Sequence, residues 1–224
     1  MKTAILVDGG FYRRRAQSRL GEKTAKERAD ELKMYCYRHL YHHGAQISDL
    51  YRIFYYDCPP MDKKVYHPLL QKQVDFSRSE LRTWMLAFIE ALKKKRKFAI
   101  RLGKLADEQA KFLLREDTTR KLCRGILRIE ELQEQDFMLD VSQKGVDMKI
   151  GLDIASLAYK QQVDQIVLIS GDSDFVPAAK LARREGIDFI LDPLYNPIKP
   201  DLFEHIDGLR TCDPKFNPKW VERS

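Results

Sequence analysis

Two carboxylates stand close together in the stretch SGDSDF, where Asp172 and Asp174 follow a short apolar run at residues 166–169. A short run rich in β-branched residues, closed by a serine and a glycine, predicts a buried parallel strand. Apolar residues at helical spacing from Phe175 onward predict that a helix comes next. Both acids therefore leave the carboxyl end of a strand, which is the edge of an open α/β sheet where ligands bind.

Two further segments place an acid in the same kind of position. Residues 3–7 form an apolar run that ends in Asp8, and the sequence KGVD puts Asp147 where a helix begins. Carboxylates that crowd together raise one another's pKa unless a positive charge joins them. A hard divalent cation meets this need, and Mg²⁺ or Mn²⁺ suits a site of carboxylates and water. The four acids thus predict a divalent-metal site.

Asp153 and Asp57 are further candidates for this site. Asp153 follows Asp147 by six residues on the expected helix, a spacing that turns the two side chains about 120° apart. We expect it at the margin of the site or bonded to Lys149. Asp57 ends an aromatic-rich strand, where a turn or capping role fits it better than metal binding. Asp174 has an alternative role as the N-cap of its helix.

The charge balance favours a polyanionic partner. Charged residues make up 33% of the 224 residues, the net charge is +7 and the pI is about 9.1. A basic surface around an acidic centre favours nucleic acid, and a merely basic surface is the alternative. Candidate phosphate-binding residues near the acids are Arg13, Arg14, Arg15, Lys144 and Lys149. A solvated helix start is the alternative interpretation of the three arginines.

The cysteines and the apolar segments indicate a cytoplasmic protein without a membrane segment. The four cysteines are far apart and have no CxxC spacing, which is typical of reduced thiols rather than of a zinc site or a disulfide set. Met1-Lys2 leads straight into a strand, without the apolar segment of a signal peptide. No apolar stretch is long enough to cross a bilayer.

The remaining pattern predicts one α/β domain at residues 1–209 with an insertion. Further apolar periodicity predicts helices at residues 25–42 and 79–92, and strands at residues 50–57, 98–105 and 187–191. Residues 60–135 are expected to contain an insertion or lid, because much of this stretch is charged and lacks a clear period. Residues 210–224 contain prolines and no periodicity, so we expect a loosely attached tail.

The order of these motifs resembles the NYN domains of the PIN-like nuclease superfamily, and most of all their LabA-like branch. The resemblance rests on Asp8 after a strand, on KGVD with Asp153 downstream, and on SGDSDF followed by a helix. It implies a three-layer α/β/α fold, Rossmann-like, with a central and mostly parallel sheet. It also implies cleavage of RNA, rather than DNA, by acids that hold Mg²⁺ or Mn²⁺; the matching positions are Asp8, Asp147, Asp172 and Asp174.

One position departs from the family pattern. Many members have Asn three residues after the first Asp, where this chain has Phe11. The alternative to a ribonuclease is therefore an RNA-binding or regulatory module of the same fold that cuts little or nothing. A phosphatase that uses Asp172 as a nucleophile fits less well, because such enzymes carry the paired acids of their DxD motif after the first strand. Here the first strand is followed by Asp8-Gly9-Gly10.

Overall fold

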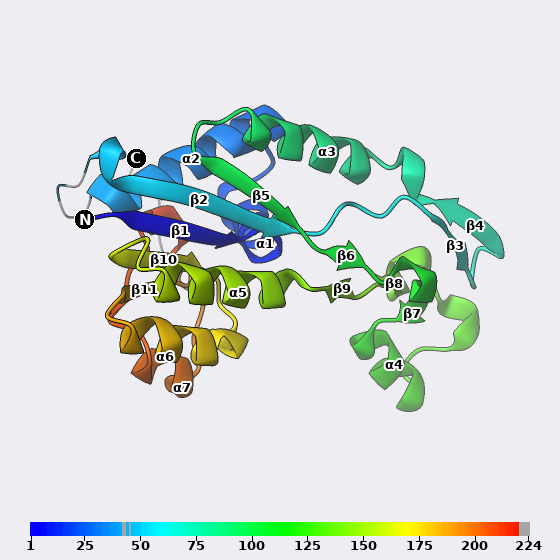
Figure 1. The fold of residues 1–224 in the computed structure, drawn as a ribbon. Helices are drawn as coiled ribbons and strands as arrows, with labels where there is room; N and C mark the ends of the chain where they lie inside the picture. Colours follow the sequence, from blue (N-terminus) through cyan, green and yellow to red (C-terminus); the bar gives the residue numbers. More distant parts are fainter. Residues whose placement is uncertain (42–43, 45, 220–224) are drawn as a thin grey trace.

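The computed structural model describes residues 1–41, 44 and 46–219. Its centre is a six-stranded parallel sheet with the strand order β12-β11-β10-β1-β2-β5 (Figure 1). The strands are β1 (Thr3–Asp8), β2 (Leu50–Asp57), β5 (Phe98–Leu102), β10 (Gln165–Ile169), β11 (Asp188–Asp192) and β12 (Gly208–Leu209). The neighbours β1 and β10 lie in the middle and are buried almost throughout, which explains their continuous apolar sequences.

Helices cover both faces of this sheet. One face carries α1 (Gly9–Leu20), α2 (Ala25–Tyr41) and α3 (Glu80–Lys93), and the other carries α5 (Val146–Tyr159), α6 (Val176–Arg184) and α7 (Pro200–Glu204) (Figure 1). Successive side chains of β1 point to opposite faces. Ile5 and Val7 join the core under the first set of helices, and Ala4 and Leu6 join the core under the second. The predicted three-layer α/β/α fold is confirmed.

Two excursions from the central layers form an arm beyond the carboxyl edge of the sheet (Figure 1). We define the arm as residues 59–79 and 103–144. Its elements are β3 (Lys64–His67), β4 (Lys72–Asp75), β6 (Lys104–Leu105), β7 (Lys111–Leu114), α4 (Glu116–Cys123), β8 (Phe137–Asp140) and β9 (Gln143–Lys144). The ring of His67 packs on those of Phe112 and Phe137, with centroids 4.3 and 5.0 Å away. These contacts join the two excursions.

The stretch 60–135, expected to contain an insertion, is interrupted by two elements of the central layers. The helix α3 and the strand β5 both lie within it, and β5 pairs with β2 at the edge of the sheet. The antiparallel pairs β3–β4 and β7–β8 belong to the arm. Strands this short give little periodicity in the sequence, so β3, β4 and β7 could not be placed in advance.

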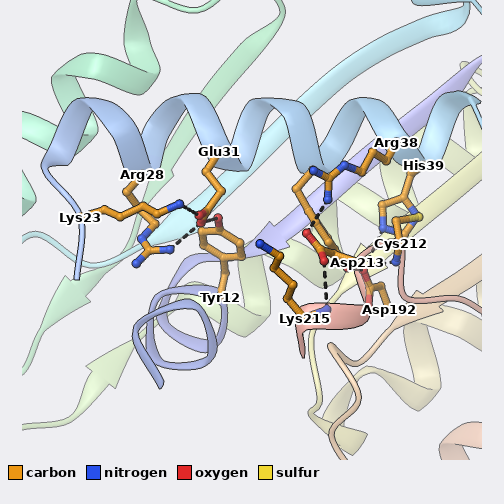
Figure 2. A network of polar contacts seen from close by, with 11 residues as sticks. Tyr12, Lys23, Arg28, Glu31, Arg38, His39, Asp192, Cys212, Asp213 and Lys215 are labelled. Atoms are coloured by element: carbon orange, nitrogen blue, oxygen red, sulfur yellow. Dashed lines mark hydrogen bonds and ion pairs between the residues drawn. The ribbon is translucent and has the colours of Figure 1, made fainter. Parts of the chain in front are cut away.

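The C-terminal residues 210–219, expected to form a loose tail, are packed against α1 and α2. Phe216 is fully buried, and its ring meets that of Tyr35 edge-on at a centroid distance of 5.4 Å. On α2, Arg38 forms an ion pair of 2.5 Å with Asp213 (Figure 2). A single anchoring aromatic has no period, which is why the sequence did not predict this packing. Residues 220–224 of the expected tail lie outside the described residues.

A buried polar network fixes the end of β11 to α2 and to this C-terminal segment. Asp192 has no exposed surface, and its carboxylate accepts hydrogen bonds from the hydroxyls of Tyr35 and Thr211. His39 Nε2 lies 2.8 Å from the same carboxylate (Figure 2). Buried carboxylates persist when they are fully hydrogen-bonded.

Among the described helices, none is long and apolar enough to cross a membrane.

Candidate active site

The carboxyl ends of β1 and β10 place Asp8 beside Ser170. Val7 and Ile169 are register partners in these parallel strands, so the residues that follow them meet at one edge. Ser170 Oγ donates a hydrogen bond of 3.3 Å to Asp8 Oδ2 and accepts one of 3.3 Å from the backbone N–H of Asp172. Ser170 therefore links the first predicted site acid to the loop that holds two others.

The loop after β10 exposes Asp172 and Asp174 to solvent. Asp172 Oδ1 accepts the backbone N–H of Asp174 at 3.0 Å and so caps a short 3-10 turn, Ser173–Phe175. The buried side chain of Phe175 anchors this turn. The capping role thus belongs to Asp172 rather than to Asp174. The carboxylate of Asp174 accepts no hydrogen bond from the described residues.

Asp147 reaches the same edge from the first turn of α5. Gly145, which precedes this helix, has a φ of 79°. Residues other than glycine rarely adopt this left-handed backbone conformation. Asp147 is exposed to solvent, but the surrounding protein still partly desolvates its carboxyl group. This desolvation, followed by the negative charges of Asp172 and Asp174, raises the pKa of Asp147.

Asp8 is the most enclosed of the four acids. Its Oδ1 accepts the backbone N–H of Phe11 at 3.0 Å and so caps α1. Burial raises the pKa of Asp8, the hydrogen bond from Phe11 lowers it, and the charge of Asp147 raises it again. The charge of Arg14 acts in the opposite direction to that of Asp147. Asp147 is thus coupled electrostatically to Asp8 on one side and to the loop acids on the other.

The donor set of these four acids suits a hard cation, although it does not form a closed cage. Within residues 1–41, 44 and 46–219, no group of three or more His, Cys, Asp or Glu side chains is arranged to hold a metal ion. The carboxylates are nevertheless all oxygen donors, and no described N–H or O–H group donates to those of Asp147 and Asp174. Mg²⁺ and Mn²⁺ take such ligands together with water.

Phe11 contributes packing at the position where many of the NYN domains that the sequence resembles have Asn. Its side chain is only 9% exposed. A Cβ atom added to Gly171 would come within 2.8 Å of the Phe11 ring and 3.3 Å of Asn196 Nδ2. The glycine of SGDSDF is therefore needed for this close approach. At the position of Phe11, the chain offers the site a backbone N–H and an apolar wall.

The three predicted phosphate-binding arginines occupy different environments. Arg13 forms a two-point ion pair with buried Asp57, at 2.8 and 3.0 Å. Arg15 donates to the backbone carbonyl of Leu194 at 2.7 Å. Arg14 is exposed and makes no hydrogen bond or ion pair with the described residues. Arg14 is therefore the arginine of this run that is available for a phosphate.

The two predicted lysines lie near the base of the arm. Lys144 and Lys149 are exposed, and together with Lys104 they line a cavity of about 590 Å³ between the arm and the start of α5. Asp147 lies between Lys144 and Lys149 in the sequence but does not line this cavity. Phosphate binding by the two lysines stays a prediction.

The two further acidic candidates have structural partners. Asp153 accepts hydrogen bonds from the Tyr56 hydroxyl at 2.8 Å and from Arg101 at 3.2 Å, rather than from Lys149. The rotation of about 120° from Asp147 directs it toward β2 and β5. Asp57 is buried and accepts the Tyr55 hydroxyl at 2.7 Å in addition to Arg13. These contacts differ from the turn or capping role expected for Asp57, which is the buried counter-charge of Arg13.

Two residues near the acids were not predicted. The sequence marks Ser170 only as the end of its strand, but its place directly after β10 puts it at the same edge as Asp8. Gln143 of β9 lies over the start of α1, with its Oε1 3.7 Å from the position of a Cβ added to Gly10. The pairing of β9 with β6 sets this position, and two-residue strands leave no signal in the sequence.

A family model for the NYN domain matches residues 85–196, which is half of the chain. This chain belongs to the NYN domain family. The matched region contains KGVD and SGDSDF and excludes Asp8. Membership places the NYN protein in the PIN-like nuclease superfamily, whose substrates are nucleic acids. The LabA-like branch stays a prediction.

A crystal structure of a protein of unknown function from Vibrio parahaemolyticus RIMD 2210633 is similar to the NYN protein over most of both chains. The sequence identity is 14%, the TM-score is 0.49, and the alignment covers 96% of this chain and 94% of that one. The comparison with curated proteins gave no match.

Proposed function

We propose that this NYN protein is a metal-dependent ribonuclease that hydrolyses phosphodiester bonds with Asp8, Asp147, Asp172 and Asp174. The observation that supports it most is that three separate segments direct these acids to one edge of the sheet, where Ser170 bonds to Asp8 and to the loop of Asp172. The mutual effects of the carboxylates on the pKa of Asp147 and Asp8 agree with this. Repelling carboxylates of this kind are stabilised by a divalent cation.

The four acids, Ser170 and the basic residues have different proposed roles. Asp8 and Asp172 are the proposed primary ligands, and Asp147 and Asp174 complete the site directly or through water. A bound Mg²⁺ or Mn²⁺ would supply the Lewis acidity that activates water and offsets charge on the phosphoryl group. Ser170 would hold Asp8 in one orientation through its hydrogen bond. Arg14, Lys144 and Lys149 would bind the phosphates on either side of the cleaved bond.

A second candidate is an RNA-binding module of the same fold that does not cut. Two observations favour it: Phe11 offers no oxygen ligand, and the described acids do not form a closed metal cage. Both candidates predict binding of RNA. They differ in whether the acids are needed for chemistry.

Cleavage of labelled RNA and DNA by purified protein separates the two candidates. The proposed ribonuclease cleaves RNA when Mn²⁺ or Mg²⁺ is present, stops when EDTA is added, and loses its activity in Asp172→Asn. Millimolar Mn²⁺ should also raise the melting temperature of the wild type more than that of Asp172→Asn, because a cation that binds only the folded protein stabilises it by mass action. Binding of RNA without cleavage in any metal would select the second candidate.

A further inference from the structure

A groove of about 480 Å³ runs beside α1, and none of the four candidate site acids lines it. Its lining includes Arg14 and Gln17 from α1, Lys23 from the following turn, and Leu81 and Trp84 from α3. Arg14 of this lining belongs to α1, the helix that Asp8 caps. The volume is in the range of small-ligand sites, about 300–1,000 Å³, and it can hold a single nucleotide.

Most of the basic side chains at this groove are already paired. Lys23 and Arg28 both contact Glu31 at 2.5 Å (Figure 2), and Arg13 is held by Asp57. Two glutamates, Glu22 and Glu80, also line the groove. The groove is therefore no continuous basic track for a phosphate backbone. Its one basic group without a partner among the described residues is Arg14.

The apolar wall of the groove is held rigidly. The indole of Trp84 stacks on Phe88, with centroids 5.1 Å apart and planes at 14°, and its Nε1 donates to the Lys23 carbonyl at 2.8 Å. Leu81, one helical turn earlier, is 63% exposed. Phe88 covers one face of the indole, and Trp84 also lines the groove. A fixed aromatic surface beside an exposed leucine suits a flat apolar ligand.

We propose that this groove is a subsite for one unpaired nucleotide of the substrate strand, whose base lies against Trp84 and Leu81 and whose phosphate lies at Arg14. The inference rests on the proposed function, because it takes nucleic acid as the substrate. A base that stacks on a protein side chain must leave its neighbours in a duplex, so such a subsite selects single-stranded substrate. The subsite therefore assigns single-stranded nucleic acid as the substrate class, which the four acids do not determine.

Fluorescence of Trp84 tests the subsite without cleavage. The only other tryptophan is Trp220, so Asp172→Asn combined with Trp220→Phe leaves one fluorophore, at the groove, in a protein designed not to cut. We expect a short unstructured RNA strand to quench it, and the blunt duplex of the same sequence to bind at least about tenfold more weakly. Mononucleotides should bind more weakly than the strand as well, because they lack flanking phosphates.

Two substitutions and a matched control locate the binding. Leu81→Glu should weaken strand binding about fivefold or more, since one stacked base is worth about 1–3 kcal/mol. Arg14→Ala should weaken it about as much, because it removes the contact to the phosphate. Leu86→Glu changes another exposed leucine of α3, which does not line the groove, and should leave binding unchanged. Circular dichroism melts should show that all three variants are folded.

Three results would overturn the subsite: equal affinity for strand and duplex, equal affinity for strand and mononucleotide, or unchanged binding in both groove variants. The proposed function is decided separately by metal-dependent cleavage in the wild type. If the wild type cleaves RNA while the groove variants bind and cleave normally, the subsite is wrong and the ribonuclease stands. If the strand binds at the groove but no metal supports cleavage, the subsite stands and the ribonuclease is wrong.

Discussion

Ser170 donates its hydroxyl to Asp8 across the ends of two neighbouring strands, at 3.3 Å. The same hydroxyl accepts the N–H of Asp172, so Ser170→Ala removes one orienting contact from each of two site segments. We expect cleavage to fall about 10–100-fold, the usual effect of losing a hydrogen bond that orients a metal ligand. Ser18→Ala, on the exposed part of α1, serves as the control and should retain full activity. Equal activity of the two variants would contradict the orienting role.

The pKa of Asp147 predicts how the metal-free protein responds to pH. Its pKa is raised in the folded state from the ordinary value of 3.8, so above that value the folded protein holds more protons than the unfolded chain. Stability therefore falls as pH rises through the interval between the ordinary and the raised pKa, and the loss is complete above it. Asp147→Asn should remove this loss.

Thermal melts in EDTA check this prediction. Asp147→Asn should melt higher than the wild type at pH 7, and the difference should shrink as the pH is lowered toward 3.8. Asp153→Asn is the control, because Asp153 is bonded to Tyr56 and Arg101, and it should melt no higher than the wild type. A wild type that melts above Asp147→Asn at pH 7 would contradict the raised pKa of Asp147.

The Gly9-Gly10 pair gives a matched test of packing under the site. A Cβ atom on Gly9 would come within 2.4 Å of the Tyr55 ring and 2.6 Å of the Tyr56 carbonyl oxygen. On Gly10 the nearest atoms would be 3.6 and 3.7 Å away, an ordinary contact. We expect Gly9→Ala to cost about 1–3 kcal/mol of stability, as overpacking does, and Gly10→Ala to cost much less. Urea unfolding measures both, and equal losses would argue against this packing of α1 on β2.

Arg13 and Arg14 are neighbours with opposite roles. Arg13→Ala leaves the carboxylate of Asp57 buried without its counter-charge, and removing one partner of a buried pair costs about 3–5 kcal/mol. Arg14→Ala should change the unfolding free energy by less than about 0.5 kcal/mol, as most surface substitutions do. Chemical denaturation of the two variants compares them directly. A destabilised Arg14→Ala with a stable Arg13→Ala would reverse the assignment.

The sequence predicted the central layers because their signals are long and repeated. Residues 50–57 are rich in aromatic and β-branched residues, residues 166–169 are an apolar run, and the apolar positions of residues 79–92 follow the helical period. Asp8, Asp147 and the SGDSDF acids could be placed at one edge, because each lies at the end of such an element and parallel strands end at the same edge of a sheet.

What the sequence could not predict depends on contacts between distant residues. The arm is built from short strands joined by the rings of His67, Phe112 and Phe137. The burial of Arg13 depends on Asp57, which lies 44 residues away. The run of three arginines is uniform as sequence, and only the fold shows which guanidinium group has no partner among the described residues. The groove at Trp84 likewise arises from the approach of α3 to α1 and the turn after it.

The most direct test of the four-acid site compares two aspartates on one helix. Asp147 and Asp153 both belong to α5, but Asp147 lies among the site acids whereas Asp153 is bonded to Tyr56 and Arg101. The measurement is the single-turnover rate of RNA cleavage in Mn²⁺ by the wild type, Asp147→Asn and Asp153→Asn. The proposed site predicts a loss of at least about 100-fold, near 2.7 kcal/mol of transition-state stabilisation, in Asp147→Asn and less than about threefold in Asp153→Asn. Equal rates in the two variants, or a larger loss in Asp153→Asn, would contradict the site.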